Sequence, residues 1–192
     1  ADTWTHTVAD GGAYTIANEG TATLTINEAV VFGAAVTLPS NQLLRAVVDI
    51  TENQIDDFEG SPVEILPSPA GTDLCYEFVS AVIALDYGGT AWTEDSAPDD
   101  LVFRYTDGNG AMVSTLIDAT GLATAVADTV VFVSPISDIP GGTTAAVPVT
   151  EAGSTDQSIV LDNTGTDWTG NGVGVMRVVI YYRLHSTAEL GL

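Results

Sequence analysis

The amino-acid sequence predicts an all-β protein built as a sandwich of two packed sheets, and three observations lead to this fold class. Roughly ten short strand candidates follow one another at about the 8 to 12 residue spacing that is typical of β-sandwiches. No series of long helices alternates with the strands, so helix content should be low. No internal repeat of fixed period is visible, which argues against a propeller or a solenoid. The 192 residues, 45% of them apolar, are enough for one well-filled core.

The other strands are arranged around the stretch from Pro62 to Tyr87 in our interpretation. This stretch predicts two strands, Val63–Leu66 and Tyr76–Leu85, joined by a turn at the breaker cluster Pro67–Gly71. Strand side chains alternate between two faces. The two sets on the second strand are Tyr76, Phe78, Ser80, Val82 and Ala84 on one face and Glu77, Val79, Ala81, Ile83 and Leu85 on the other. Both sets are mostly apolar, which predicts a sandwich, or a sandwich that also packs against a neighbouring subunit.

The residues before this stretch predict an N-terminal extension, followed by the first strand of the sandwich. Thr21–Asn27 alternates threonine with apolar residues, and Ala29–Val36 is a second apolar run. These segments either extend the main sheet or form an arm that orders on a partner. Leu43–Ile50 is a further strand candidate, and a single helical turn is expected within Ile50–Gly60. We therefore divide the chain into residues 1–45, an arm or a set of extra strands, and residues 46–192, the sandwich.

The segments after Tyr87 predict a hairpin, a short helix and several more strands. The clearest hairpin is LVFRYTDGNGAMVSTLI, residues 101–117, because Asp-Gly and Asn-Gly pairs supply the positive φ angles of tight turns. A short helix is expected within Ala119–Ala127. The remaining strand candidates are Val130–Val133, Ala146–Val149, Ser158–Leu161 and Val173–Leu184.

The last strand, Val173–Leu184, has one unbroken apolar face and a second face on which two arginines alternate with apolar residues. The first face consists of Met176, Val178, Ile180, Tyr182 and Leu184. On the second face, the surroundings of Arg177 and Arg183 are too apolar for a plain solvent face, and we expect both guanidinium groups to pair with acidic groups across a subunit contact. The predicted interface residues are Arg177, Val179, Tyr181 and Arg183. The alternative is that both arginines lie flat on the exterior of the sheet.

Charge is the most unusual property of the composition. The chain has 26 acidic residues, four arginines and no lysine, with a formal net charge of -22. At about 1 M salt the Debye length falls to roughly 3 Å and the resulting self-repulsion is nearly removed, so this charge predicts a protein made for a very salty medium. The alternative is a merely acidic surface domain. Nucleic-acid binding is disfavoured because no basic patch exists to neutralise phosphates, and no apolar run is long enough to span a membrane.

No constellation of catalytic or metal-binding residues stands out, so we expect a protein that is not an enzyme and holds no cofactor and no metal. His6 and His185 are the only histidines, and neither belongs to a nucleophile or metal-binding motif. Cys75 is the only cysteine and should pack as a small hydrophobic side chain. Oxygen-bearing side chains that could hold calcium, although without the spacing of a calcium loop, are Asp107, Asn109, Asp162, Asp167 and Asn171.

From about Val63 to Arg183 the sequence resembles jelly-roll proteins that are encoded among the structural genes of tailed viruses and that decorate or cement the capsid. The resemblance lies in an order of features: VEILPSPAG, a strand ending in ALDYGGTAW, then DLVFRYTDGNG, VSTLIDATGL, VFVSPI, the glycine-rich LDNTGTDWTGNGVGVM and the closing RVVIYYRL. It does not cover residues 1–45. The extreme acidity and the lack of lysine depart from that pattern and point to a virus of an extremely salt-loving host, such as a haloarchaeal tailed virus.

The resemblance implies a β-sandwich of jelly-roll type that forms a homotrimer and binds the outer surface of a shell built by the major capsid protein. Such a protein is a decoration, cement or turret component of the virion, and residues 1–45 would contact the capsid or another partner. The alternative function is a host-surface or carbohydrate-binding jelly roll of a virion fibre or spike. For that alternative the candidate recognition residues are Trp92 and Trp168, which stand in polar sequence contexts and are equally suited to a protein interface. Fold analogy alone does not fix function.

Overall fold

The computed structural model of the chain describes residues 42–58, 60–94, 100–136, 151–165, 168–170 and 172–191. The strands predicted at Thr21–Asn27, Ala29–Val36 and Ala146–Val149 lie outside these residues. Most of the predicted N-terminal extension, residues 1–45, lies outside them as well. The first described strand begins at Leu44, so it crosses the predicted boundary between residues 45 and 46.

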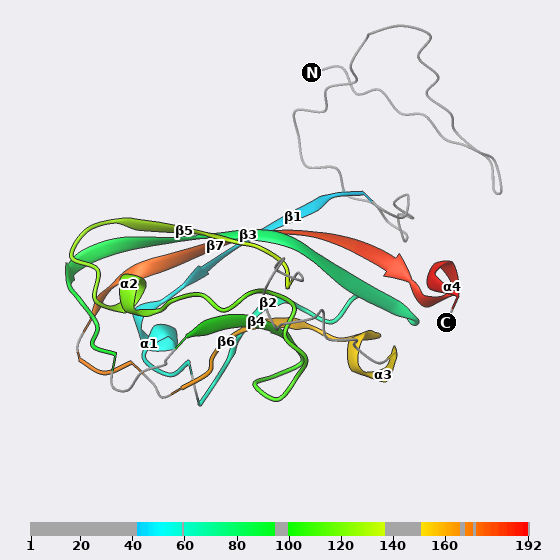
Figure 1. Cartoon of the computed structure of the whole chain (residues 1–192), viewed down its shortest axis with the longest axis horizontal. Coiled ribbons are helices and arrows are strands. Elements are labelled where there is room, and N and C mark those ends of the chain that lie inside the picture. Colours follow the sequence, from blue (N-terminus) through cyan, green and yellow to red (C-terminus); the bar gives the residue numbers. More distant parts are fainter. Residues whose placement is uncertain are drawn as a thin grey trace, which may run out of the picture. The chain divides into compact units, whose positions relative to one another are not determined.

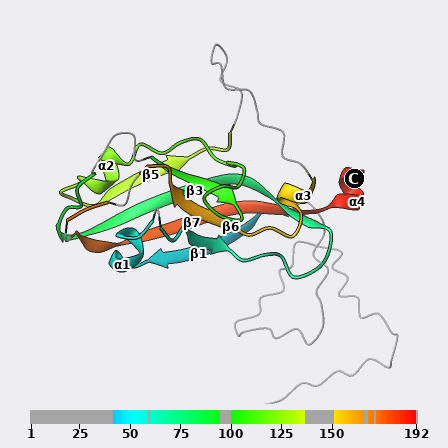
Figure 2. The ribbon, with the colours of Figure 1, turned by 90° about the horizontal axis from the view of Figure 1, so that it is seen from below.

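The described residues form two antiparallel sheets that pack against each other (Figure 1). The strands are β1 (Leu44–Ile50), β2 (Val63–Leu66), β3 (Leu74–Thr90), β4 (Leu101–Tyr105), β5 (Thr129–Val133), β6 (Ile159–Asn163) and β7 (Val173–Ser186). The larger sheet has the order β1-β7-β3-β5, which Figure 2 shows as four neighbouring strands, and the smaller has the order β2-β6-β4. Short helices of one turn are α1 (Glu52–Ile55), α2 (Thr120–Ala123), α3 (Glu151–Ser154) and α4 (Thr187–Leu190). The predicted all-β sandwich is confirmed.

The chain alternates between the two sheets in the order of a jelly roll. Residues 111–117 run back along β4, where Tyr105 N donates to Ala111 O at 3.0 Å and Leu101 N donates to Ile117 O at 3.0 Å. If this segment is counted as a strand after β4, the described residues contain eight strands. Numbered one to eight along the chain, these strands form sheets with the orders 1-8-3-6 and 2-7-4-5. Two interleaved Greek keys of this kind make a double-sheet jelly roll. The hairpin predicted at residues 101–117 is therefore present.

The turn of that hairpin owes its shape to different residues from those predicted. Its positive φ angle, 68°, is at Thr106, and neither Gly108 nor Gly110 adopts one. Gly110 is required for another reason, since a Cβ atom at this position would collide with the carbonyl oxygen of Tyr105. The glycine therefore permits a close approach of two backbone segments.

β2 and β3 do not pair with each other, so the prediction of two strands joined by a simple turn is wrong. β2 pairs with β6, whereas β3 lies between β5 and β7 in the other sheet. The intervening segment, which begins at Pro67, crosses between the sheets because proline cannot donate to a sheet ladder. The hydroxyl of Tyr76 donates to the carbonyl of Pro67 at 2.9 Å and anchors this crossing.

A bulge in β3 changes which residues face the core. The register between β3 and β7 shifts between Phe78 and Ser80. Tyr76 and Phe78 are buried before the shift, and Ala81, Ile83 and Leu85 are buried after it. The predicted alternation holds up to Phe78 and is wrong beyond that residue, because one extra residue in a bulged strand reverses the two faces.

The core fills the space between the sheets. Its large side chains come from both sheets and from the segment around α1, and they include Ile50, Ile55, Phe58, Ile83, Phe103, Leu161, Met176 and Ile180. Full burial of one such side chain stabilises the fold by about 1.5–3 kcal/mol. The helical turns predicted within Ile50–Gly60 and Ala119–Ala127 are confirmed as α1 and α2, and Thr51 and Gln54 form a capping box on α1.

Candidate functional site

The candidate site is the side of the larger sheet that points away from the core, which we call the outer face. On β7, Met176, Val178 and Ile180 are fully buried, so the alternating residues between and beyond them point outward. All the residues predicted as a subunit interface lie on the outer face, on this one strand: Arg177, Val179, Tyr181 and Arg183. The structure thus groups them on one surface.

A row of apolar side chains crosses the outer face at one level of the register. Phe132 of β5 lies opposite Val82 of β3, and Val82 lies opposite Val179 of β7. Val179 in turn lies opposite Val47 of β1. We call these four residues the apolar row. Its two ends are open to solvent, with Phe132 80% and Val47 46% exposed. Sequence analysis missed the row, because it depends on the pairing of strands that are distant in sequence.

The arginine at the centre of the outer face is paired within its own chain. Arg177 lies opposite Asp49 of β1 and donates two hydrogen bonds, from Nε to Oδ1 at 2.6 Å and from Nη2 to Oδ2 at 2.9 Å. The hydrogen bond from Arg177 holds the pKa of Asp49 below its usual value. Both side chains remain largely exposed. The acidic partner expected from a neighbouring subunit is therefore present in the same sheet.

A second charged group surrounds Glu77 on β3. Arg183 Nη1 donates to Glu77 Oε1 at 2.9 Å, and His185 Nε2 lies 2.8 Å from Glu77 Oε2. Partial burial acts to raise the pKa of Glu77, but the hydrogen bonds to His185 and Arg183 outweigh it, and the net pKa lies below the usual 4.5. His185 also lies opposite Cys75, a proximity that sequence analysis missed.

The surroundings of this cysteine disfavour an activated nucleophile. Cys75 is buried, and its burial raises the pKa of the thiol. A reactive cysteine requires the opposite shift, since the thiolate is the nucleophile. The imidazole of His185 is engaged by Glu77. The prediction that Cys75 packs as a small hydrophobic side chain is confirmed, whereas His6 lies outside the described residues.

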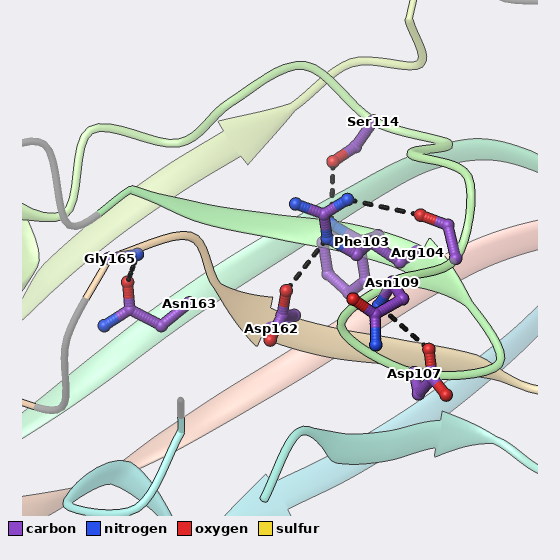
Figure 3. A network of polar contacts seen from close by, with 9 residues as sticks. Phe103, Arg104, Asp107, Asn109, Ser114, Asp162, Asn163 and Gly165 are labelled. Atoms are coloured by element: carbon purple, nitrogen blue, oxygen red, sulfur yellow. Dashed lines mark hydrogen bonds and ion pairs between the residues drawn. The ribbon is translucent and has the colours of Figure 1, made fainter. Parts of the chain in front are cut away.

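The smaller sheet carries a polar cleft of about 440 Å³ around Arg104 and Asp162 (Figure 3). Arg104 Nε donates to Asp162 Oδ2 at 2.8 Å, and Arg104 Nη1 donates to the carbonyl of Gly110 at 3.2 Å. The side chains of this pair are only 17% and 5% exposed. Burial raises the pKa of Asp162, and Arg104 offsets part of that rise.

Three of the five candidate calcium ligands meet in this cleft, but with a cation already among them. Asp107, Asn109 and Asp162 all line it, together with Arg104. The guanidinium group of Arg104 already forms an ion pair with the Asp162 carboxylate. A metal ion would therefore have to compete with Arg104 for this carboxylate. Within the described ranges, no group of three acidic, cysteine or histidine side chains is arranged to hold a metal ion. The other two candidates, Asp167 and Asn171, lie outside those ranges.

Both tryptophans proposed for surface recognition are core residues, so the predicted stacking surface is absent at these positions. Trp92 and Trp168 are each 2% exposed and lie 6.4 Å apart between ring centroids. Trp168 also packs edge-on against Phe58, and Trp92 Nε1 donates to Asp56 Oδ1 at 2.7 Å. A Cβ at Gly172 would collide with the Trp92 ring, so this glycine lets the ring pack against the backbone.

Comparisons with known proteins add one distant likeness. No protein-family model matches the chain, and no curated protein matches it. A solved structure described as "Capsid of Ralstonia phage GP4" is similar at 14% sequence identity and a TM-score of 0.35, over 78% of this chain and 88% of that one. A likeness this weak carries no argument about function. In the described part of the chain, none of the helices has the length and apolar character needed to cross a membrane.

Proposed function

We propose that this chain is a non-enzymatic structural protein of a virion, a homotrimeric capsid decoration, cement or turret protein. It binds the outer surface of the major capsid protein lattice and stabilises the shell. The observation that carries the proposal is the outer face: a sandwich with a complete core exposes a row of apolar side chains across four strands. Contiguous exposed apolar surface is a common protein interaction site, and we take the apolar row to be one. The jelly-roll order of the strands and the sequence resemblance to decoration proteins support the same proposal.

The described side chains favour attachment over catalysis. The buried charged pair, Arg104 and Asp162, is held by a salt bridge and a backbone carbonyl, which is the arrangement of a structural pair. Burial raises the pKa of the Cys75 thiol, which disfavours the nucleophilic thiolate. The carbohydrate-binding alternative has lost its candidate residues, because Trp92 and Trp168 lie in the core. Binding to another protein is the function that the remaining surface fits best.

The charge of the chain sets the conditions under which it acts. With a net charge of -22 and no lysine, it has little affinity for nucleic acid and repels copies of itself unless salt screens the repulsion. We place the chain on the outside of a virion whose host lives in concentrated salt. There its acidic surface remains hydrated and its apolar contacts remain effective.

Binding to shells tests the proposed function. Purified chain should be added, in multimolar salt, to capsid shells that lack it and then sedimented with them. We expect saturable binding and shells that withstand heating or dilution better once they are decorated. A control with the acidic chain unfolded beforehand separates specific attachment from trapping. Shells that neither bind the folded chain nor gain stability from it would contradict the proposal.

A further inference from the structure

The outer face concentrates the few cations of the chain. The sequence has four arginines and no lysine. Arg45 of β1 lies opposite Tyr181 of β7, and its alternation with the inward side chains of β1 places it on the same side as Arg177 and Arg183. Arg104, the fourth arginine, lies in the polar cleft of the smaller sheet. Three of the four positive charges therefore lie on a single face of a chain whose net charge is -22.

One of these three arginines has no acidic partner in the described structure. Arg177 is paired with Asp49, and Arg183 is paired with Glu77. Arg45 is exposed, and no salt bridge joins it to an acidic group among the described residues. It stands on the edge strand, two residues before Val47 at one end of the apolar row. The outer face thus presents apolar area together with a positive charge at its rim that none of the described acidic groups pairs.

We propose that the outer face docks a second copy of this chain, with the apolar row at the centre of the contact and Arg45 paired with a carboxylate of the neighbouring copy. This inference rests on the self-assembly in the proposed function and assigns the surface that performs it.

Charge complementarity favours a second copy as the occupant. Away from the outer face the described chain has a single cation, Arg104, whereas the sequence has 26 acidic residues. A neighbouring copy therefore offers carboxylates for Arg45 to pair with. Contacts between two different surfaces of identical chains are heterologous, and they close into a ring when the rotation allows it. Complementary charge fixes the register of such contacts, while the apolar centre supplies most of the affinity.

The experiment compares full-length variants by sedimentation velocity in multimolar potassium chloride. Phe132→Asp places a charge at the most exposed end of the row, where the 80% exposure of Phe132 makes the fold tolerant of it. Val126→Asp is the matched control, because Val126 is 77% exposed and lies before β5, outside the sheet. We expect Phe132→Asp to raise the dissociation constant for self-association by about tenfold or more, with the control unchanged. Circular dichroism checks that both variants keep the β-sheet spectrum.

Two further variants guard against an effect that is local to one residue. Val47→Asp, at the opposite end of the row, should weaken self-association as Phe132→Asp does. Arg45→Gln, which removes the positive charge at the rim without adding a new one, should weaken it by a smaller factor. A wild-type monomer under these conditions would overturn the inference. So would Phe132→Asp and Val47→Asp variants that associate as tightly as wild type.

Shell binding by the same variants separates this inference from the proposed function. If both aspartate variants keep the wild-type oligomeric state but no longer bind shells, the outer face docks the shell protein, and the inference fails while the proposed function stands. If the variants dissociate and the wild-type oligomer does not bind shells, the inference stands and the proposed function fails.

Discussion

The outward sides of the two sheets differ in how completely the described residues cover them. On the smaller sheet, Val102 and Val160 alternate with core residues, yet they are 0% and 4% exposed. On the larger sheet, the equivalent outward positions include Phe132 at 80% and Val130 at 54%. The ion pairs follow the same division, since Arg104 and Asp162 are nearly buried whereas Arg177 and Asp49 are open to solvent.

Among the described residues, the smaller sheet is covered by its own chain, whereas the larger sheet exposes apolar side chains, which we propose a partner covers. Loops around Asp107–Gly110 and Asn163–Gly165 wall the polar cleft of the smaller sheet, so its charged pair is a stability element of the single chain. Among the described residues, Phe132 and Val47 at the two ends of the apolar row remain open to solvent, and we propose that a neighbouring copy covers them. Substitutions on the two sides should therefore affect different quantities: folding for the smaller sheet and association for the larger.

The largest effect we expect is that of salt, which acts on the acidic surface as a whole. The net charge of -22 opposes both folding and the approach of two copies, and salt screens it. The midpoint of thermal unfolding, followed by circular dichroism, should rise by many degrees between low and multimolar salt. A midpoint that does not respond to salt would contradict the proposal that the protein is adapted to concentrated salt.

The two ion pairs give the sharpest test of the difference between the sheets. Arg104→Ala leaves a nearly buried carboxylate unpaired and should lower the free energy of unfolding by about 3–5 kcal/mol. Arg177→Ala removes an exposed pair and should change the stability of the folded chain little, while weakening self-association. Chemical denaturation and sedimentation measure the two quantities. Equal losses of stability in the two variants would show that the sheets do not differ in this way.

Two glycine substitutions test how tightly the loops over the smaller sheet are packed. Gly110→Ala forces a Cβ against the Tyr105 carbonyl and should destabilise the fold by about 1–3 kcal/mol. Gly121→Ala is the matched control in α2, where the added atom meets nothing within 4 Å. The control should be neutral or stabilising by about 0.5–1 kcal/mol, because alanine favours the helix. Denaturant titration of both variants measures these differences.

The smallest effect concerns pH on the outer face. The pKa of Glu77 in the folded chain lies below its usual 4.5, so its ion pairs stabilise the fold above that pH. This contribution is lost as the pH falls through the lowered folded-state pKa. Glu77→Gln should therefore be less stable than wild type above pH 4.5, by less than about 1 kcal/mol since the pair is partly exposed. The difference in stability between Glu77→Gln and wild type should disappear in more acidic buffer. A difference that grows there would contradict the role given to the Glu77 ion pairs.

The strands of this fold can be predicted from sequence because each has a local signature. The apolar runs at Val63–Leu66 and Val130–Val133 and the alternation in Val173–Leu184 depend on neighbouring residues alone, and each is a strand in the structure. The outward position of Arg177 and Val179 followed from the same alternation. What these residues contact in an assembly remains a prediction.

The features that sequence analysis missed all depend on distant parts of the chain. The bulge after Phe78 reverses the faces of β3, and apolar alternation continues on both sides of it, so no local signal marks it. Trp92 and Trp168 stand among polar residues in sequence, and contacts such as those with Phe58 and Gly172 contribute to their burial. The apolar row exists only through the register of four strands.

Cryo-electron microscopy of the native particle tests the central claim most directly. We predict density for this sandwich on the outside of the shell, in closed groups of copies, with the outer face of each copy covered by its neighbour. Arg45 should lie against a carboxylate of that neighbour. Particles without the chain, or groups in which Phe132 and Val47 face open solvent, would contradict the account.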